Sequence, residues 1–208
     1  MCGIRTAASP TYDAHRAGVA QEMTVGETYA RSIIPTRDIR NEDFYPTPPR
    51  STQALLDVER FDGPIWEPAC GDGAMAKVLK NNGYDVVSTD LVDRGYGTHG
   101  IDFLMEYKSL APNIVTNPPF KHAVPFLRKA LSLSTGKVAF LCRLAWLEGK
   151  ERKKIFQNTP IARVWVFSER IPMLRNGDVM HAGGGGMIAF AWFVWDHSHK
   201  GPPTLGWI

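Results

Sequence analysis

The segment Thr-Asn-Pro-Pro-Phe at residues 116–120 places a side-chain amide, two consecutive prolines and an aromatic ring directly after a short apolar run. Proline fixes its own φ angle, has no N–H group to donate, and biases the residue before it away from helix. The turn is therefore stiff and rich in acceptors, with the Asn117 amide on one side and the Phe120 ring on the other. The same residues could simply end an edge strand, with Asn117 as a cap and Phe120 in the core.

A second group of residues, Ile-Trp-Glu-Pro-Ala-Cys-Gly-Asp-Gly at 65–73, predicts a short strand, a tight turn of small residues and the start of a helix. Ligands of open α/β sheets bind at such carboxyl ends of strands, and glycine lets them approach the backbone closely. The turn lacks the G-x-G-x-x-G pattern of a dinucleotide site. Glu67 and Asp72 would repel a pyrophosphate, so the turn favours a ligand that carries an ammonium or sulfonium group.

Two further carboxylates follow at positions that suit a nucleoside. Asp90 comes eighteen residues after Asp72, at the predicted end of the second strand, where a carboxylate typically binds ribose hydroxyls. Asp102 and Phe103 offer a carboxylate and a ring face for an adenine. Each aspartate alone is more often a strand-end cap or turn residue, but their order and spacing together predict a nucleoside with a cationic tail, a description that fits S-adenosylmethionine.

The elements that must position these groups alternate between strands and helices. The sequence predicts strands at 65–67, 84–89, 113–116, 137–144, 162–167 and 188–195, and helices at 48–58, 74–81, 123–133 and 146–156. Thr47 is expected to cap the first of these helices. Such alternation indicates an α/β fold with a mainly parallel sheet covered on both faces. The turn with Asn117, which follows the strand at 113–116, then lies on the same sheet edge as the glycine turn.

Composition bounds the class of protein. The 208 residues include 44% hydrophobic and 22% charged residues, the ordinary range for a globular chain, with a formal net charge of +3. No apolar run is long enough to span a membrane. Three widely spaced cysteines argue against a disulfide framework and for a reducing, cytoplasmic compartment. We expect an N-terminal arm at 1–40, one domain at 41–200 and a C-terminal tail at 201–208.

Several motifs together resemble class I S-adenosylmethionine-dependent methyltransferases, and among them the phage- and prophage-type DNA adenine-N6 methyltransferases. The motifs are F-Y-P-T-P-P at 44–49, E-P-A-C-G-D-G at 67–73, S-T-D-L at 88–91, D-F-L at 102–104, T-N-P-P-F at 116–120 and the aromatic strand at 189–196. The resemblance covers roughly residues 44–196. It implies a Rossmann-like fold whose mainly parallel seven-stranded sheet has helices on both faces and an antiparallel last strand.

The resemblance also implies roles for individual residues. Asn117, Pro118, Pro119 and Phe120 would be catalytic: the Asn117 oxygen and the Pro118 carbonyl would accept the two N–H bonds of the adenine N6 amine, and Phe120 would stack on the base. The cofactor-binding residues would be Tyr45, Thr47, Glu67, Pro68, Ala69, Cys70, Gly71, Asp72, Asp90, Leu91, Asp102, Phe103 and Asn117. No metal site is predicted, and the expected partner is DNA.

Other targets and a non-enzymatic function stay open on these residues. Asn-Pro-Pro-aromatic also occurs in enzymes that methylate RNA adenine or a glutamine amide of a protein, since both targets are planar, conjugated nitrogens. Methylation of cytosine N4 more often accompanies a serine in place of Asn117. A degenerate cofactor- or nucleic-acid-binding module, such as an anti-restriction protein, is the alternative without catalysis. Beyond the predicted core, three parts of the chain are left to recognise DNA: the N-terminal arm, a glycine-rich loop at 169–187 with four glycines at 183–186, and the Arg/Lys clusters. Of these clusters, Lys150, Arg152, Lys153 and Lys154 form a basic helix face that either contacts phosphates or is simply a solvated surface.

Overall fold

The computed structural model describes residues 44–173 and 188–208, all of which belong to one compact unit, Ile39–Ile208. The predictions made for the arm at 1–40 and for the four glycines at 183–186 lie outside the described residues. Within the described ranges, no helix combines the length and hydrophobicity that a membrane span requires.

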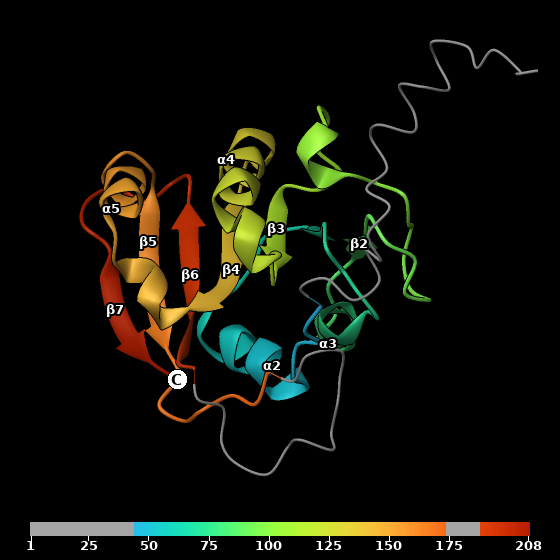
Figure 1. Ribbon diagram of the computed structural model, residues 1–208, viewed down its shortest axis with the longest axis horizontal. Coiled ribbons are helices and arrows are strands. Elements are labelled where there is room, and N and C mark those ends of the chain that lie inside the picture. Colours follow the sequence, from blue (N-terminus) through green and yellow to red (C-terminus); the bar gives the residue numbers. More distant parts are fainter. Residues whose placement is uncertain (1–43, 174–187) are drawn as a thin grey trace, which may run out of the picture. The chain divides into compact units, whose positions relative to one another are not determined.

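Seven strands form one sheet in the order β2-β1-β3-β4-β6-β5-β7 (Figure 1). They are β1 (Ile65–Glu67), β2 (Val86–Ser88), β3 (Asn113–Thr116), β4 (Lys137–Arg143), β5 (Ile161–Val166), β6 (Phe190–Asp196) and β7 (Thr204–Trp207). The pairs β1–β2, β1–β3, β3–β4 and β5–β7 are parallel, whereas β6 runs antiparallel to both β4 and β5. The predicted mainly parallel, seven-stranded Rossmann-like sheet is confirmed.

Helices cover both faces of the sheet (Figure 1). They are α2 (Pro49–Val58), α3 (Ala74–Asn81), α4 (Ala123–Leu133) and α5 (Lys150–Gln157). Leu55 of α2 and Leu79 of α3 pack in one core cluster with the sheet, and Leu127 of α4 and Ile155 of α5 pack in the other. Burial on both faces explains why strands such as β3 are buried at every position rather than at alternate positions.

The aromatic strand β6 lies in the middle of the sheet and fills both cores. Trp192, Phe193 and Trp195 are fully buried. The indole N–H groups that this burial removes from water find acceptors, since Trp192 Nε1 donates to the Ser51 carbonyl at 2.8 Å and Trp195 Nε1 donates to Thr159 Oγ1 at 3.0 Å.

Three local expectations are wrong. Residues 201–208 are not a tail: β7 pairs in parallel with β5 and forms one edge of the sheet. The predicted helix at 146–156 begins only at Lys150, because Gly149 has a φ of 106° and separates α5 from the 3₁₀ helix Leu144–Leu147. Thr47 does not cap α2; Pro48 is the N-cap residue and makes no side-chain cap, and the Thr47 hydroxyl has another partner.

Candidate functional site

The candidate site lies where the parallel strands end. Because β2, β1, β3 and β4 run in the same direction, the residues after each of them meet at one edge of the sheet. This edge brings together the turn after Glu67, the carboxylate of Asp90 and the turn that contains Asn117. The expectation that the glycine turn and the proline turn share one edge is therefore confirmed by the strand pairing.

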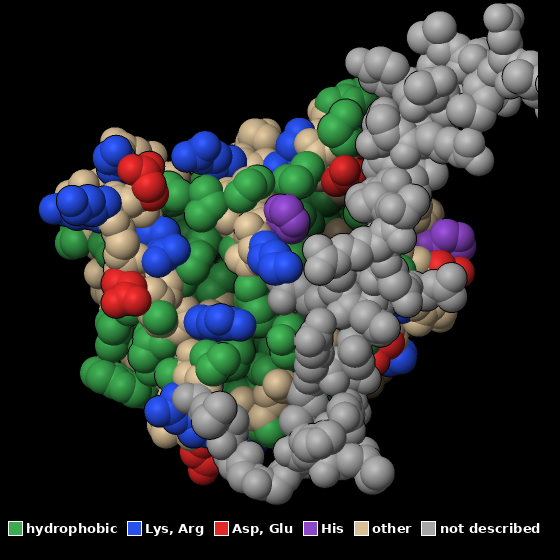
Figure 2. All heavy atoms as spheres, viewed as in Figure 1, with side chains coloured by type: hydrophobic (Ala, Val, Ile, Leu, Met, Phe, Trp, Pro, Cys, Tyr) green, Lys and Arg blue, Asp and Glu red, His purple; other side chains and the backbone are tan. Residues whose placement is uncertain are grey.

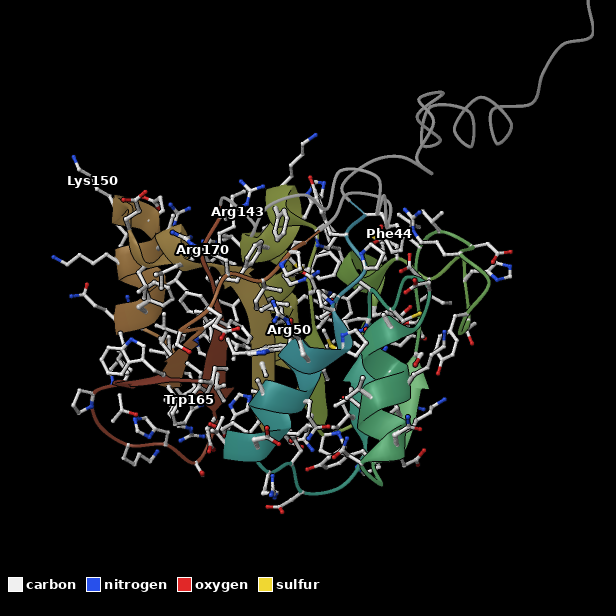
Figure 3. All side chains as sticks on the ribbon, turned by 90° about the horizontal axis from the view of Figure 1, so that it is seen from below. Phe44, Arg50, Arg143, Lys150, Trp165 and Arg170 are labelled. Atoms are coloured by element: carbon white, nitrogen blue, oxygen red, sulfur yellow. The ribbon has the colours of Figure 1, made fainter. Side chains whose placement is uncertain are left out.

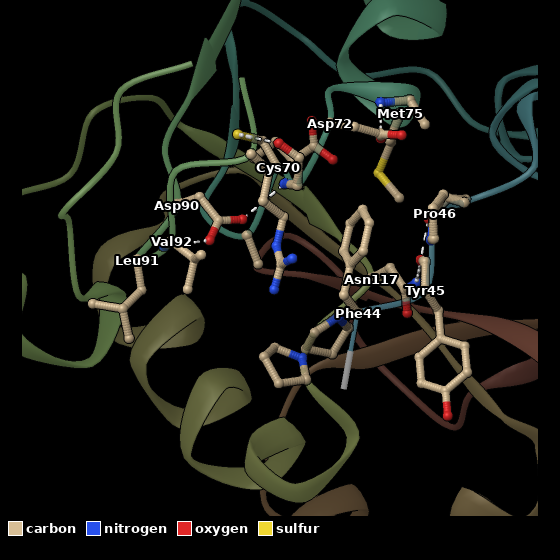
Figure 4. Close-up of a pocket in the computed structure, with 18 of the residues that line it drawn as sticks. Phe44, Tyr45, Pro46, Cys70, Asp72, Met75, Asp90, Leu91, Val92 and Asn117 are labelled. Carbon is tan, nitrogen blue, oxygen red and sulfur yellow. Dashed lines mark hydrogen bonds between the residues drawn. The ribbon is translucent and has the colours of Figure 1, made fainter. Parts of the chain in front are cut away.

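A pocket of about 200 Å³ opens at this edge. One side carries the acidic side chains Asp72 and Asp90, and the other carries Tyr45 and Asn117, with the Phe44 ring between them (Figure 4). Segments 44–47, 67–75, 90–94 and 117–122 all contribute to the lining. The site is thus assembled from four chain segments that are far apart in sequence.

Glu67 is the most deeply buried of the acidic groups, with 2% of its surface exposed. Its Oε2 atom has no hydrogen-bond partner among the described residues. Burial raises the pKa of Glu67 well above its ordinary value; a hydrogen bond from the Ala76 backbone opposes the rise, and the charges of Asp90 and Asp72 add to it. An unpartnered carboxyl oxygen that lines a pocket is ready to interact with a cationic ligand.

Asp90 and Asp72 are fixed by backbone N–H groups. Asp90 accepts from the Gly71 N–H at 2.7 Å and, through its other oxygen, from the Val92 N–H at 2.9 Å. Asp72 accepts from the Ala74 N–H at 3.1 Å, at the start of α3. Each carboxylate oxygen can accept more than one hydrogen bond, so Asp90 keeps acceptor capacity for hydroxyl groups of a ligand.

Phe44 and Gly71 form a close packing contact at the floor of the pocket. Gly71 has a φ of 56°, and a Cβ atom built on it would lie 2.5 Å from Cε2 of Phe44. Only glycine allows this ring to sit against the turn. The Arg94 guanidinium lies over the Phe44 ring, 4.2 Å from the ring centroid.

Asn117 has its side-chain orientation set by two acceptors. Its Nδ2 group donates to the Tyr45 carbonyl at 3.2 Å and to Thr47 Oγ1 at 3.3 Å. Because the Tyr45 carbonyl can only accept, the amide nitrogen must face it, and the amide oxygen must point the other way. That oxygen, Asn117 Oδ1, is buried and has no hydrogen-bond partner among the described residues.

The prolines and Phe120 continue the same wall. The Pro119 carbonyl accepts from the His122 N–H at 2.8 Å, whereas no backbone hydrogen bond to the Pro118 carbonyl is found within the described part of the chain. The half-buried Phe120 ring contacts Tyr45, at 5.3 Å between ring centroids. The Arg143 guanidinium lies over Phe120, 4.6 Å from the ring centroid.

The structure brings most of the predicted site residues to this pocket. Its lining includes Tyr45, Thr47, Glu67, Ala69, Cys70, Gly71, Asp72, Asp90, Leu91, Asn117, Pro118, Pro119 and Phe120. Burial and the charges of Glu67 and Asp90 raise the pKa of the Cys70 thiol to about 12, which disfavours the nucleophilic thiolate form.

Three predicted residues do not line the pocket. Pro68 is buried behind it. Phe103 is 2% exposed and packs against Trp66 and Phe126, so the expectation that its ring stacks on an adenine is wrong. Asp102 accepts from the Leu104 N–H at 2.9 Å and caps the 3₁₀ helix Phe103–Met105. Its contact with an adenine amine stays a prediction.

Sequence reasoning missed several lining residues. Arg94 has no signal of its own, apart from its position in the loop after Asp90, whereas Phe44 begins the F-Y-P-T-P-P motif but is not among the expected site residues. Met75 shows only helical spacing, which predicts a core residue. No group of three or more potential metal ligands occurs within the described residues.

Comparison with known proteins identifies the fold. No protein-family model matches the sequence, and no curated protein matches it. Solved structures do match. The chain superposes over 86% of its length, with a TM-score of 0.53 and 15% identity, on a protein assigned as the modification subunit of a type I restriction enzyme from Vibrio vulnificus. It spans only 49% of that longer chain.

Two other similar structures differ from the first in function. One is magnesium protoporphyrin IX methyltransferase from Synechocystis with bound S-adenosylmethionine (TM-score 0.51, 12% identity, 72% of this chain and 79% of that chain). The other is a protein from Lactococcus lactis assigned as a hemolysin (TM-score 0.50, 12% identity, 76% of this chain and 88% of that chain). At such identities the likeness defines the fold alone: this chain has the Rossmann-like fold found in class I methyltransferases.

Proposed function

We propose that the protein transfers a methyl group from S-adenosylmethionine to the exocyclic N6 amine of adenine in DNA. The observation that carries this proposal is the buried Oδ1 atom of Asn117, which has no hydrogen-bond partner in the described part of the chain and is held in its orientation by two hydrogen bonds from the Nδ2 group of the same amide. Leaving a buried acceptor without a partner costs stability, so the oxygen is best explained by a ligand donor that completes it.

The residues around the pocket fit the cofactor. S-adenosylmethionine supplies an electrophilic methyl group on a sulfonium centre when it is bound. Glu67, with its unpartnered buried oxygen, favours the positively charged part, and Asp90 has acceptor capacity for ribose hydroxyls. Arg94 and Lys121 add two cations to a lining that also carries the carboxyl groups of Glu67, Asp72 and Asp90, a combination that suits a tail with both an ammonium and a carboxylate group.

The proline turn suits the other reactant. The N6 amine of adenine is a weak nucleophile because its lone pair is delocalised into the ring. Asn117 Oδ1 and the Pro118 carbonyl can each accept a hydrogen bond from one of the two N–H groups of the amine. This favours a pyramidal nitrogen with an available lone pair. The prolines hold the carbonyl direction, so little reorganises during the reaction. Phe120 offers a ring face for stacking of a base that has left its helix.

The choice of DNA over the alternative targets is supported by the match to a restriction-enzyme modification subunit, which covers more of this chain than the other two matches do. RNA adenine and a protein glutamine amide present a similar planar nitrogen to Asn117. An anti-restriction module would need the pocket but not the free acceptor. The residue chemistry therefore favours an enzyme, and the identity of the polymer is the part to test.

The direct test is transfer of tritiated methyl groups from S-adenosylmethionine to DNA, RNA and protein side by side, followed by nucleoside and amino-acid analysis. We expect radioactivity in N6-methyladenine from DNA. Label in N6-methyladenine from RNA or in methylglutamine would reassign the substrate while keeping the chemistry. Binding of the cofactor without transfer to any of the three polymers would favour the non-enzymatic alternative.

Glu67 predicts a pH dependence of cofactor binding. Its pKa is raised in the free pocket, so the carboxyl stays protonated above its ordinary pKa of 4.5. A sulfonium cation nearby favours the charged form, so binding releases a proton and the affinity for S-adenosylmethionine rises with pH until Glu67 is ionised in the free protein too. The rise is at most about tenfold per pH unit for one proton.

Calorimetric titration in buffers with different ionisation enthalpies measures the protons released. S-adenosylhomocysteine, which lacks the sulfonium charge, should release fewer protons than S-adenosylmethionine. Glu67→Gln keeps the shape of the side chain and should abolish the difference. If this variant released as many protons as the wild type, another group would be responsible.

A further inference from the structure

A second pocket of about 250 Å³ lies directly beside the candidate catalytic turn. Phe120 lines both pockets, so the second one starts where the first one ends. Its other walls come from the start of α4, the end of β4, the following 3₁₀ helix with Glu148, and α5. The lining residues are Phe120, Ala123, Cys142, Arg143, Ala145, Trp146, Glu148 and Arg152. None of the sequence motifs accounts for this cavity.

The polar groups of this second pocket are mainly donors. Arg143 is exposed, and its guanidinium lies over the Phe120 ring, 4.6 Å from the ring centroid. Arg152 is half-buried, and its Nε atom donates to the Glu148 carbonyl at 2.5 Å. This hydrogen bond orients the guanidinium group. The Trp146 indole N–H makes no hydrogen bond with the described part of the chain, and its ring packs on Phe156 and Phe193.

The surroundings are also suited to an anion. Figure 2 shows lysine and arginine side chains both in the middle of the face that it presents and along its periphery, where the acidic side chains also lie. Figure 3 shows that Arg143 and Phe44 lie along one edge of the fold, with Trp165 toward the opposite edge. Glu148 is the one carboxylate among the residues that line the second pocket, and its side chain is exposed.

We propose that Arg143 and Arg152 bind a backbone phosphate of the nucleic-acid strand next to the target nucleotide, with the Trp146 indole N–H as a third donor. Paired guanidinium groups match the geometry of phosphate oxygens, and such contacts set the register of a strand without reading its sequence. The proposal rests on the proposed function, since a base held on Phe120 places its neighbouring phosphate within the adjoining pocket. It explains how a small chain orients a strand at the site.

The test is a salt titration of DNA binding by fluorescence anisotropy, with a labelled 20-base-pair duplex and saturating S-adenosylhomocysteine. The slope of log K against log salt counts the phosphates that a protein neutralises. We expect Arg143→Gln and Arg152→Gln each to reduce the slope by about 1 and to weaken binding by about tenfold at low salt. Glu148→Gln removes a carboxylate that repels phosphate and should strengthen binding by about twofold to threefold.

Lys200→Gln is the matched control, because it also removes one positive charge. Lys200 is exposed and follows Asp196, which pairs with Lys137 at the start of β4, whereas Arg143 ends that strand. Lys200 therefore lies near the end of the sheet where β4 begins, away from Arg143. The salt slope and the DNA affinity of the Lys200→Gln variant should stay those of the wild type. Affinity for S-adenosylhomocysteine should be unchanged in all four variants, which shows that the fold is intact.

The proposal is overturned if the two arginine variants behave like Lys200→Gln, or if the wild type binds no DNA. Failure of the proposed function gives a different result. In that case the arginine variants still change the salt slope, but tritium transfer to the same duplex is absent. A duplex that is both bound with the expected slope and methylated supports both proposals.

Discussion

Replacing Asn117 with alanine should lower methyl transfer by about 10²–10³-fold while the affinity for S-adenosylhomocysteine changes little. The reason is the unpartnered Oδ1 atom, which is the acceptor that the structure holds ready for an amine proton. An interaction made mainly in the transition state lowers kcat and kcat/KM together, whereas a lost ground-state contact raises KM alone. Single-turnover rates with pre-bound cofactor separate the two outcomes.

Two companion variants make this prediction sharper. Thr47→Val keeps the volume of residue 47 but removes the hydroxyl that accepts from Asn117 at 3.3 Å, so we expect a smaller loss, since the Tyr45 carbonyl still orients the amide. Asn81→Ala replaces an exposed asparagine at the end of α3 and should leave the rate unchanged. A near-normal turnover of the Asn117→Ala variant would remove the catalytic assignment of this side chain.

The sheet was predictable because its signals are local and strong. A buried parallel strand shows as a short, mainly apolar run, and the apolar residues Ile65 and Trp66 of β1 and Ile114 and Val115 of β3 give this signal. Carboxylates and rigid turns directly after these runs predict the site edge, since all parallel strands end on the same side. The residues Glu67, Asp90 and Asn117 could thus be placed in one pocket from the sequence alone.

The incorrect expectations arose where tertiary contacts override local preference. Residues 204–207 directly follow Pro202 and Pro203 and are expected from the sequence to form a tail. Pairing with β5 makes them a strand. Thr47 has the residue type of a helix cap, yet its hydroxyl accepts from Asn117. Phe103 follows an aspartate in a motif-like position, yet its ring is packed against Trp66 in the core. Each of these outcomes depends on a partner that lies far away in sequence.

The largest feature without a sequence signal is an ion-pair network centred on Glu59. It lies at the end of the sheet where β4 begins, opposite the end that carries the candidate site. Its carboxylate accepts from Lys137 Nζ at 2.9 Å, from Arg163 Nε and Nη2, and from Trp165 Nε1 at 3.0 Å. The side chain is 2% exposed. Its partners are 78 to 106 residues away in sequence, so no local pattern could indicate them.

Glu59→Gln should destabilise the fold by about 3–5 kcal/mol, because it removes the charge that compensates Lys137 and Arg163 in a largely buried place. Urea unfolding followed by tryptophan fluorescence measures this change. Glu151→Gln is the matched control. Glu151 also pairs with a lysine, Lys154, at 3.0 Å, but the two side chains are 75% and 69% exposed, so the loss should be about 0.5 kcal/mol or less.

The same network predicts how the difference between wild type and Glu59→Gln varies with pH. Burial acts to raise the pKa of Glu59, but hydrogen bonds from Arg163, Lys137 and Trp165 outweigh it and hold the pKa below its ordinary value of 4.5. A carboxyl group whose pKa is lowered by folding stabilises the fold at pH values above its unfolded-state pKa. This stabilisation is lost as the pH falls through the folded-state pKa. The two proteins should therefore differ fully near neutral pH and converge in acid below 4.5. A difference that stayed constant down to strongly acidic pH would show that the shape of the side chain, and not its charge, stabilises this edge of the sheet.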